Sequence, residues 1–288
     1  MGTHNQIERI IDIALEEDVA RGDRTTELII PANMGGSAAI IAREDAVVAG
    51  GEIARIALLK VDQSLEVKME IQDGNPAKAG EVVMVITGRV TSILKAERVI
   101  LNFLSHLSGV ATLTARYVEK VKDLGVKIGD TRKTLPGLRL LEKYAVYAAG
   151  GQNNRPDLAS GILIKDNHLV AMAAKGISIS EGIAKAKAGA NGMKVEIEVQ
   201  NLEQLKQAVD GKPDIIMLDN MSLDDIREAV KTVPTTISLE ASGGITLENV
   251  REVAEAGVDL ISVGAITHSA RGVNFSLDFV TGRPAAQE

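Results

Sequence analysis

The sequence predicts an α/β protein whose second half repeats a strand followed by a helix. Six short apolar runs lie between residues 126 and 265, and each ends in polar residues or glycine. Helical patterns separate several of these runs, and the last three repeats are spaced roughly 20 residues apart, the length of one strand plus one helix. Buried strands joined by helices form parallel sheets or βα barrels, so we expect one of these two architectures.

The first 124 residues have a different pattern. Residues 1–23 place isoleucine and leucine at helical spacing with acidic residues between them, which predicts an amphipathic helix rather than a secretion signal. Residues 26–90 carry β-branched runs punctuated by glycine and proline, which predicts short strands and turns. Residues 91–124 predict a long helical stretch that Gly109 breaks in two.

The second half supplies strands and helices in alternation. The predicted strands lie in VKIGDTRK (126–133), GILIKDNH (161–168), VEIEVQN (195–201), DIIMLDN (214–220), ISLEASGG (237–244) and LISVGA (260–265). The predicted helices lie in SEGIAKAKAG (180–189), NLEQLKQAVD (201–210), SLDDIREAVKT (222–232) and TLENVREVAEAG (246–257).

The amino-acid composition excludes several classes of function. The 32 lysines and arginines are outnumbered by 39 aspartates and glutamates, which argues against a general nucleic-acid or membrane-surface binder. No apolar run reaches the roughly 20 residues that a membrane span needs. Cysteine is absent, which excludes disulfides and thiolate nucleophiles and fits a reducing cytoplasm.

The ends of the predicted strands carry an unusual set of side chains. In a βα barrel the active site lies at the carboxyl ends of the strands, where the βα loops converge. Ordinary turns would not combine cations, carboxylates and glycines at these positions, so we expect a functional site there. The strand-end residues are Asp130, Arg132, Lys133, Lys165, Asp166, Asn167, Glu198, Asp219, Asn220, Glu240, Ser242, Gly243, Gly244 and Gly264.

Glycines follow two consecutive strands. Ser242-Gly243-Gly244 precedes a predicted helix, and Gly264 follows the next strand. Glycine lets backbone N–H groups approach an anion, and a helix N-terminus adds partial positive charge. We interpret the pair of glycine sites as a phosphate site, with a plain tight turn as the alternative.

Cations cluster between residues 130 and 165 of this acidic chain. Arg132, Lys133 and Lys165 lie at strand ends, and Arg155 follows a glycine-rich loop. Together they suggest a substrate with several negative charges. Arg139 and Lys143, four residues apart, are interpreted instead as a solvated helix face.

Two carboxylates, Glu198 and Asp219, end consecutive strands. In a site rich in phosphate-binding groups they suggest Mg²⁺ or sugar hydroxyls, with helix capping or an internal salt bridge as the alternative. The four histidines lack the spacing of a zinc site, so zinc is not expected.

Several segments resemble the quinolinate phosphoribosyltransferase family, and they follow the expected order over nearly the whole chain. They are GDRTT (22–26), AERVILNFLSHLSGVAT (96–112), DTRKTLPGLRLLEKYAV (130–146), LIKDNH (163–168), VEIEVQN (195–201), IIMLDN (215–220), LEASGGIT and ISVGAITHS.

The resemblance implies an activity and an architecture. The activity converts quinolinate and phosphoribosyl pyrophosphate to nicotinate mononucleotide, pyrophosphate and CO₂ in NAD biosynthesis. The architecture is an incomplete βα barrel of the type II phosphoribosyltransferase kind (111–272) and an N-terminal α/β sandwich domain (1–110) that segment 273–288 rejoins. We also expect Mg²⁺ as the cofactor, a homodimer or a higher oligomer of dimers, and a cytoplasmic location. No nucleic-acid or membrane partner is expected.

The resemblance also implies roles for individual residues. Arg132, Arg155 and Lys165 would bind the two carboxylates of quinolinate, and Arg98 would reach the active site of the partner subunit. Lys133 and Lys165 would neutralise pyrophosphate, and Glu198 and Asp219 would hold Mg²⁺ or the ribose. Lys133, Lys165, Glu198 and Asp219 are the implied catalytic residues. The implied substrate-binding set is Arg98, Thr131, Arg132, Lys133, Asn154, Arg155, Lys165, Glu198, Asp219, Ser242, Gly243, Gly244, Val263, Gly264 and Ala265.

One position departs from the family pattern. Asn154 stands where a substrate-contacting histidine is usual, and asparagine can donate a hydrogen bond but carries no positive charge. Three alternatives stay open from the residues: a related phosphoribosyltransferase for another acidic heterocycle, an aldolase using Lys165 as a Schiff base, and a non-catalytic binding protein.

Overall fold

The computed structural model describes residues 3–280. The chain divides into two compact units, and each is described by itself. Unit 1 holds Met1–Ala115, Leu135–Gly150 and Ser269–Glu288, and unit 2 holds Arg116–Thr134 and Gly151–His268. The domain boundaries expected from the sequence stay a prediction, and residues 281–288 of the expected C-terminal segment lie outside the described residues.

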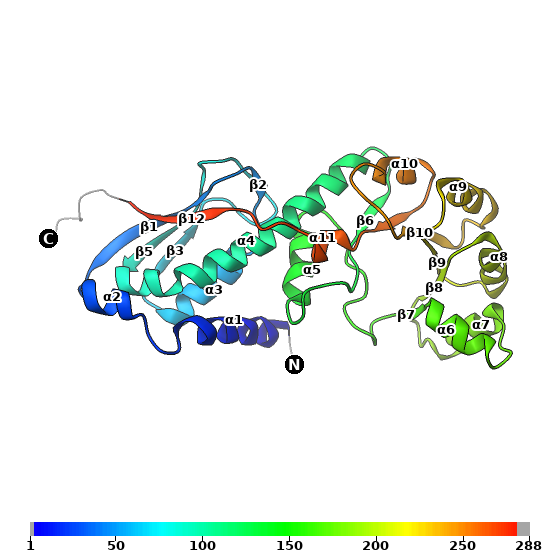
Figure 1. Ribbon diagram of the computed structural model, residues 1–288, viewed down its shortest axis with the longest axis horizontal. Helices are drawn as coiled ribbons and strands as arrows, with labels where there is room; N and C mark the ends of the chain where they lie inside the picture. Colours follow the sequence, from blue (N-terminus) through cyan, green and yellow to red (C-terminus); the bar gives the residue numbers. More distant parts are fainter. Residues whose placement is uncertain (1–2, 281–288) are drawn as a thin grey trace. The chain divides into compact units, whose positions relative to one another are not determined.

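Unit 1 is built on an antiparallel sheet in the order β12-β1-β5-β3 (Figure 1). The strands are β1 (Gly35–Ala42), β3 (Glu66–Met69), β5 (Val82–Arg89) and β12 (Phe275–Phe279), and a second small sheet pairs β2 (Ala46–Val47) with β4 (Pro76–Ala77). The helices are α1 (Thr3–Val19), α2 (Arg24–Ile29), α3 (Gly51–Val61), α4 (Val90–Val121) and α5 (Arg139–Ala148). The division between the two units falls within α4.

The structure corrects two expectations in this half. Residues 51–61 form helix α3, whereas the sequence predicted strands and turns there. Its buried residues Ile53, Ala54, Ala57 and Leu58 follow helical spacing, which the surrounding strand pattern masked. Helix α4 also continues through Gly109 without a break. A Cβ at Gly109 would lie 2.3 Å from the carbonyl oxygen of Arg271, so glycine allows close approach of two backbones rather than ending the helix.

Unit 2 is an open βα barrel, which confirms the fold class. Six parallel strands follow the order β6-β11-β10-β9-β8-β7, and Figure 1 shows α8 and α9 on the outer side of the strands. The strands are β6 (Lys127–Gly129), β7 (Ile162–Ile164), β8 (Val195–Val199), β9 (Ile215–Asp219), β10 (Ser238–Ser242) and β11 (Leu260–Ser262). The helices are α6 (Asp166–Ala173), α7 (Ile179–Gly189), α8 (Leu202–Gly211), α9 (Leu223–Thr232), α10 (Val250–Glu255) and α11 (Ala265–His268).

Alternation along the strands separates the core from the barrel interior. In β8, Val195, Ile197 and Val199 are fully buried, and their spacing of two places them on the helix-covered face. Glu196 and Glu198 therefore face the interior of the barrel. Glu198, a polar residue of the site, lies on this interior face.

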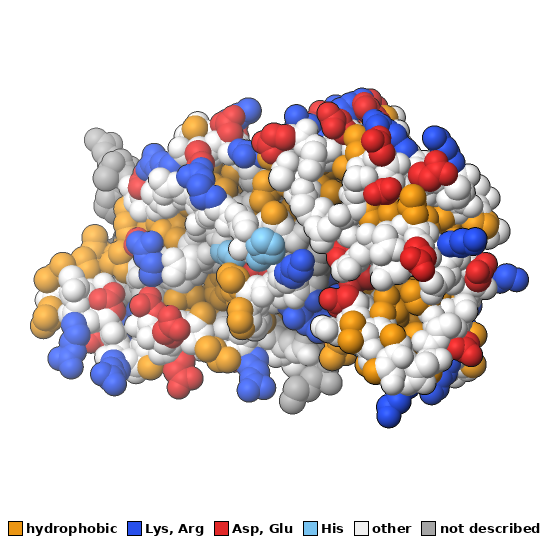
Figure 2. All heavy atoms as spheres, turned by 45° about the vertical axis from the view of Figure 1, so that its right-hand side comes forward, with side chains coloured by type: hydrophobic (Ala, Val, Ile, Leu, Met, Phe, Trp, Pro, Cys, Tyr) orange, Lys and Arg blue, Asp and Glu red, His pale blue; other side chains and the backbone are white. Residues whose placement is uncertain are grey.

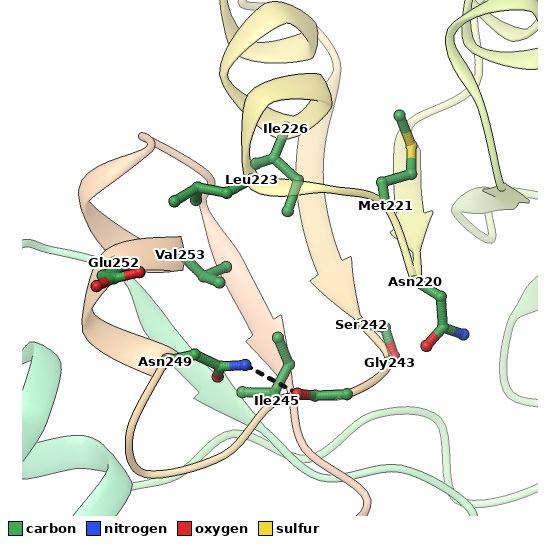
Figure 3. Close-up of a pocket in the computed structure, with 11 residues that line it drawn as sticks. Asn220, Met221, Leu223, Ile226, Ser242, Gly243, Ile245, Asn249, Glu252 and Val253 are labelled. Atoms are coloured by element: carbon green, nitrogen blue, oxygen red, sulfur yellow. Dashed lines mark hydrogen bonds between the residues drawn. The ribbon is translucent and has the colours of Figure 1, made fainter.

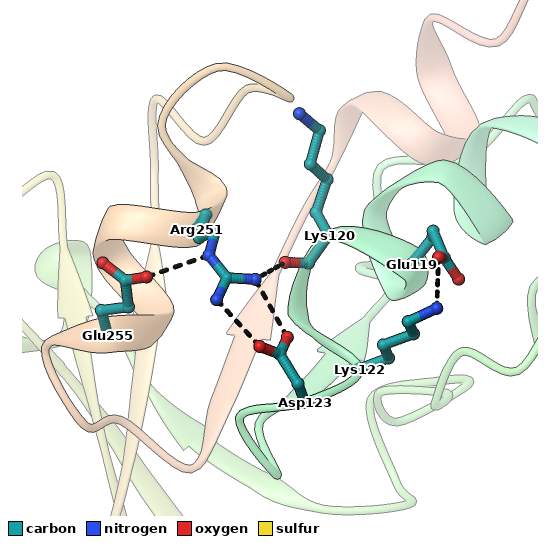
Figure 4. A network of polar contacts seen from close by, with 6 residues as sticks. All are labelled: Glu119, Lys120, Lys122, Asp123, Arg251 and Glu255. Carbon is teal, nitrogen blue, oxygen red and sulfur yellow. Dashed lines mark hydrogen bonds and ion pairs between the residues drawn. The ribbon is translucent and has the colours of Figure 1, made fainter.

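Helix α10 is tied to the segment after α4 by Arg251 (Figure 4). Its guanidinium donates to both carboxylate oxygens of Asp123 at 2.9 Å, to the carbonyl of Lys120 at 3.1 Å and to Glu255 at 2.9 Å. The fork geometry of arginine satisfies these acceptors at once. This network fixes α10, which follows the glycine turn of the site.

On the face drawn in Figure 2, basic and acidic side chains are intermingled. Within residues 3–280, no helix has both the length and the apolar character to cross a membrane.

Candidate active site

A cavity of about 350 Å³ opens at the carboxyl ends of the barrel strands. Nine residues of the implied substrate-binding set line it, contributed by loops and strands from six parts of unit 2. The cavity therefore gathers four cations and two carboxylates that lie far apart in the sequence. These nine are Thr131, Arg132, Lys133, Asn154, Arg155, Lys165, Glu198, Asp219 and Ser242, and Leu163, Met217 and Asn220 complete the lining.

Lys165 is held by both its backbone and its side chain. Its backbone N–H donates to Nδ1 of His168 at 2.9 Å, so the histidine side chain caps the start of α6. Its Nζ donates to Oε1 of Glu198 at 2.7 Å. The capped helix start fixes the backbone, and the ion pair then directs the ammonium group into the cavity.

Two arginines face the same cavity. Burial, and then the charge of Arg132, lowers the pKa of the Arg155 guanidinium. Its Nη1 donates to the carbonyl of Gly161 at 3.0 Å, while its Nε is buried with no hydrogen-bond partner. Two crowded cations with an unsatisfied buried donor create a strong preference for an anion.

Asp130 positions the loop that carries Asn154 and Arg155. It is fully buried, and its Oδ1 accepts a hydrogen bond from the backbone N–H of Asn154 at 2.6 Å. The adjacent backbones pair as well, since Asp130 N–H donates to the carbonyl of Gln152 at 3.0 Å. Asp130 thus orders this loop.

Lys133 lies beside the second glycine site. A Cβ at Gly264 would lie 3.2 Å from Cδ of Lys133 and 3.1 Å from Nε2 of His268, so glycine leaves room for both side chains. His268 was not among the predicted site residues. Its position one turn after Gly264, in a short helix that follows a barrel strand, is the signal that could have found it.

The glycine turn after β10 is shaped by Asn220. Gly243 and Gly244 both have positive φ, at 88° and 62°, which favours glycine. A Cβ at Gly243 would lie 2.4 Å from Oδ1 of Asn220, and Figure 3 shows this side chain beside Ser242 and Gly243. The turn borders a second pocket of about 290 Å³, where Nδ2 of Asn249 donates to the carbonyl of Gly244 at 2.9 Å.

A pair of buried carboxylates lies inside the barrel, below the strand ends. Glu240 is the middle residue of β10, so the expectation that it lies at a strand end was wrong. Burial raises the pKa of both Glu196 and Glu240, and the neighbouring carboxylates raise that of Glu196 further. Glu240 accepts a hydrogen bond from the hydroxyl of Ser262 and shares another with the carboxyl group of Glu196.

Some predicted residues lie outside this cavity. Arg98 is on α4 in unit 1, with its side chain 63% exposed and 4.0 Å from Glu97. Val263, Gly264 and Ala265 follow β11 and line neither pocket. Lys143 is only 5% exposed, so its interpretation as part of a solvated helix face was wrong.

Two lining residues were not among the predicted site residues. Leu163 and Met217 have the composition of core strands, whereas Asn220 belongs to the predicted set of strand-end residues. Leu163 lies two residues before Lys165, and Met217 two residues before Asp219. The period of two along a strand therefore gave the signal that places them on the interior face.

The donor set fits a magnesium ion that a phosphorylated substrate helps to hold. Within the described part of the chain, no group of three or more histidine, aspartate or glutamate side chains could hold a metal ion alone. Mg²⁺ is usually bound by one or two carboxylates together with phosphate oxygens and water. Glu198 and Asp219 supply two such carboxylates in the cavity.

The open barrel and the four cations of its cavity define a βα-barrel protein with a site for a ligand that carries several negative charges. Two family models divide the chain between them: quinolinate phosphoribosyl transferase, N-terminal domain, matches residues 23–108, and the C-terminal domain matches residues 110–278. The chain belongs to the quinolinate phosphoribosyltransferase family.

Individual relatives agree over almost the whole length. The chain is 38% identical over 286 residues to a probable nicotinate-nucleotide pyrophosphorylase [carboxylating] of Bacillus subtilis, covering 99% of this chain and 97% of the relative. The structure of the nicotinate-nucleotide pyrophosphorylase from Francisella tularensis superposes with a TM-score of 0.89 at 37% identity, covering 97% and 98% of the two chains. NadC from Streptococcus pyogenes gives 0.89 at 38% identity, covering 96% and 97%.

Proposed function

We propose that this enzyme transfers phosphoribosyl from phosphoribosyl pyrophosphate to quinolinate with decarboxylation, forming nicotinate mononucleotide, pyrophosphate and CO₂. The observation that carries the proposal is the gathering of Arg132, Lys133, Arg155 and Lys165 around one cavity. Both substrates are polyanions, and the four cations can neutralise their negative charges. The two carboxylates, Glu198 and Asp219, are available for the ribose.

The four cations divide into two pairs according to the substrate group that each pair binds. Arg132 and Arg155 bind the two carboxylates of quinolinate, because guanidinium forks match carboxylate geometry. Lys133 and Lys165 neutralise the diphosphate, as mobile point charges. The turn at Ser242, with Gly243, Gly244 and the segment 263–265, receives the 5′-phosphate through backbone N–H groups.

The reaction needs no protein nucleophile. The pyridine nitrogen attacks the anomeric carbon while the bond to pyrophosphate breaks, through a state with oxocarbenium character. Glu198 and Asp219 stabilise the positive charge that develops on the ribose, and the lysines stabilise the charge on the departing diphosphate. The pyridinium ring then accepts the electron pair released as the adjacent carboxylate leaves as CO₂, and the ring carbon takes a proton.

Glu198 and Asp219 are the residues that would hold Mg²⁺. When bound, the ion would neutralise further charge on the diphosphate. Because Lys165 already pairs with Glu198, the lysine would turn toward the diphosphate when the carboxylate is engaged.

The assembly and location are part of the proposal. A homodimer in which the partner subunit supplies Arg98 would give the exposed guanidinium on α4 a role that its weak contact with Glu97 does not. The cysteine-free composition supports a cytoplasmic enzyme.

The decisive experiment measures quinolinate-dependent release of CO₂ and pyrophosphate, with and without Mg²⁺. We expect both products in equal amounts with Mg²⁺ and a large loss of rate after chelation. Nicotinate in place of quinolinate is the control substrate, and it should give no CO₂. Folded protein that releases neither product from quinolinate at any pH would refute the assignment.

A further inference from the structure

The backbone of Lys133 is held on both sides by threonine hydroxyls. The N–H of Lys133 donates to Oγ1 of Thr131 at 3.0 Å. Its carbonyl accepts a hydrogen bond from Oγ1 of Thr267 at 2.7 Å. Thr267 belongs to α11, 134 residues further along the chain, so this bond joins two separate loops of the site.

The surroundings of Thr267 require its hydroxyl to donate a hydrogen bond. Thr267 is 2% exposed, and a buried hydroxyl needs an acceptor. The carbonyl of Gly264 lies 3.1 Å from the same oxygen, so the hydroxyl sits between the main chain of Lys133 and the second glycine site. A single buried hydroxyl therefore fixes the spacing of these two elements.

The segment that carries Lys133 is a loop. Residues 130–138 between β6 and α5 form no regular helix or strand. The side chain of Lys133 is exposed, and its Cδ passes Gly264. The two hydrogen bonds to the backbone of Lys133 therefore hold the point from which this side chain extends.

We propose that Thr267 is a positioning residue that holds Lys133 in the orientation needed to meet the diphosphate. This inference rests on the proposed function, in which Lys133 neutralises the leaving group. Thr267 itself touches no substrate; it acts through the backbone of Lys133.

The test compares T267V and T267S with T114V. Valine keeps the shape of threonine and removes the hydroxyl, whereas serine keeps the hydroxyl. Thr114 is the matched control because it is fully buried and its Oγ1 donates to the carbonyl of Val110 at 2.8 Å within α4. Chemical denaturation records the stability of each variant.

We expect T267V to lower kcat/KM for phosphoribosyl pyrophosphate roughly five- to tenfold, the loss of one net hydrogen bond, with KM for quinolinate nearly unchanged. T267S should restore the wild-type value. T114V should lose similar stability with unchanged kinetics. A T267V enzyme that matches T114V in both stability and kinetics would overturn the proposal.

Two further measurements separate this inference from the proposed function. Calorimetric titration with pyrophosphate alone should show weaker binding by T267V, whatever the second substrate is. In a K133A background, T267V should cause no further loss, since the group that it positions is gone. An undiminished loss in that background would overturn the role of Thr267, whereas an inactive wild type that binds pyrophosphate would refute only the assigned reaction.

Discussion

Lys165 and Glu198 form an ion pair between neighbouring strand ends, with Nζ of the lysine 2.7 Å from Oε1 of the glutamate. The register of β7 against β8 pairs Ile164 with Ile197, so the next residues along the two strands fall side by side. Both side chains line the cavity. The lysine that we assign to the diphosphate is therefore held by the carboxylate that we assign to the ribose or to a metal.

Replacement of Lys165 tests this arrangement. We expect K165M to lower kcat/KM by roughly 10²–10³-fold, by analogy with the loss of one preorganised charge-stabilising donor. Lys185, an exposed lysine on α7, provides the control K185M, which should keep wild-type kinetics. Steady-state kinetics with both substrates decides the matter, and a K165M enzyme within a few-fold of wild type would exclude Lys165 from the reaction.

Replacement of the planar guanidinium of Arg155 should weaken the binding of quinolinate more than that of the second substrate. R155K keeps the charge but loses bidentate geometry, so KM for quinolinate should rise about tenfold or more. KM for phosphoribosyl pyrophosphate should change little. R251K, at the surface network of α10, is the control. Equal increases in both KM values would contradict the assignment of Arg155 to the quinolinate carboxylates.

We expect the substitution N154H to be tolerated. Its backbone N–H, not its side chain, makes the 2.6 Å bond to Asp130, so N154H should keep the loop in place and leave catalysis intact. A histidine there becomes cationic below about pH 6.5, so KM for quinolinate should fall as the pH drops from about 8 to 6, relative to wild type. Kinetics across this range provides the check, and an inactive N154H enzyme would contradict it.

The buried acid pair predicts a pH-dependent stability. Burial raises the pKa of Glu196 to about 8 and that of Glu240 to about 7. Between the unfolded pKa, about 4.5, and these values the native state retains more protons than the unfolded state, so stability falls as pH rises.

The variant E240Q removes one of these protonation sites. Its free energy of unfolding should fall less steeply than that of wild type from pH 5 to 8, by up to about 1.4 kcal/mol per pH unit. Urea denaturation at each pH measures the slope. The exposed Glu203 gives the control E203Q, which should follow wild type. Parallel curves for E240Q and wild type would show that the pair does not titrate in this range.

A site that takes Arg98 from the partner subunit should allow two inactive variants to restore activity when they are mixed. R98A and K165M should each be nearly inactive alone. If each site takes Arg98 from the partner subunit, mixed dimers contain one intact site, and an equal mixture should recover about a quarter of wild-type activity. Subunits are exchanged in mild denaturant and assayed after refolding. No recovery in a mixture shown to contain mixed dimers would place Arg98 outside a shared site.

The barrel and most of its cavity were predictable because their signals are local. Each strand ends in polar residues, and parallel strands bring those ends to one edge, so Arg132, Lys165 and Asp219 could be placed together without knowing any contact. The apolar lining was harder, since Leu163 and Met217 look like core residues and only the interior face of the barrel distinguishes them.

Features that depend on distant partners could not be read from the sequence. Gly109 looks like a helix breaker until the backbone of Arg271 is seen against it. Lys143 has the spacing of a surface lysine, yet it is buried. The proton shared by Glu196 and Glu240 likewise arises from burial and from two strands meeting inside the barrel.

The pairing of β12 with β1 has a consequence for biosynthesis. Ala38 lies opposite Phe279, so the first sheet gains its border strand from a segment that is made after all the strands of the barrel. Until then one side of β1 offers unpaired backbone groups, a template for faulty association between nascent chains. The ribosome must therefore complete the barrel segments before the first-made sheet is sealed.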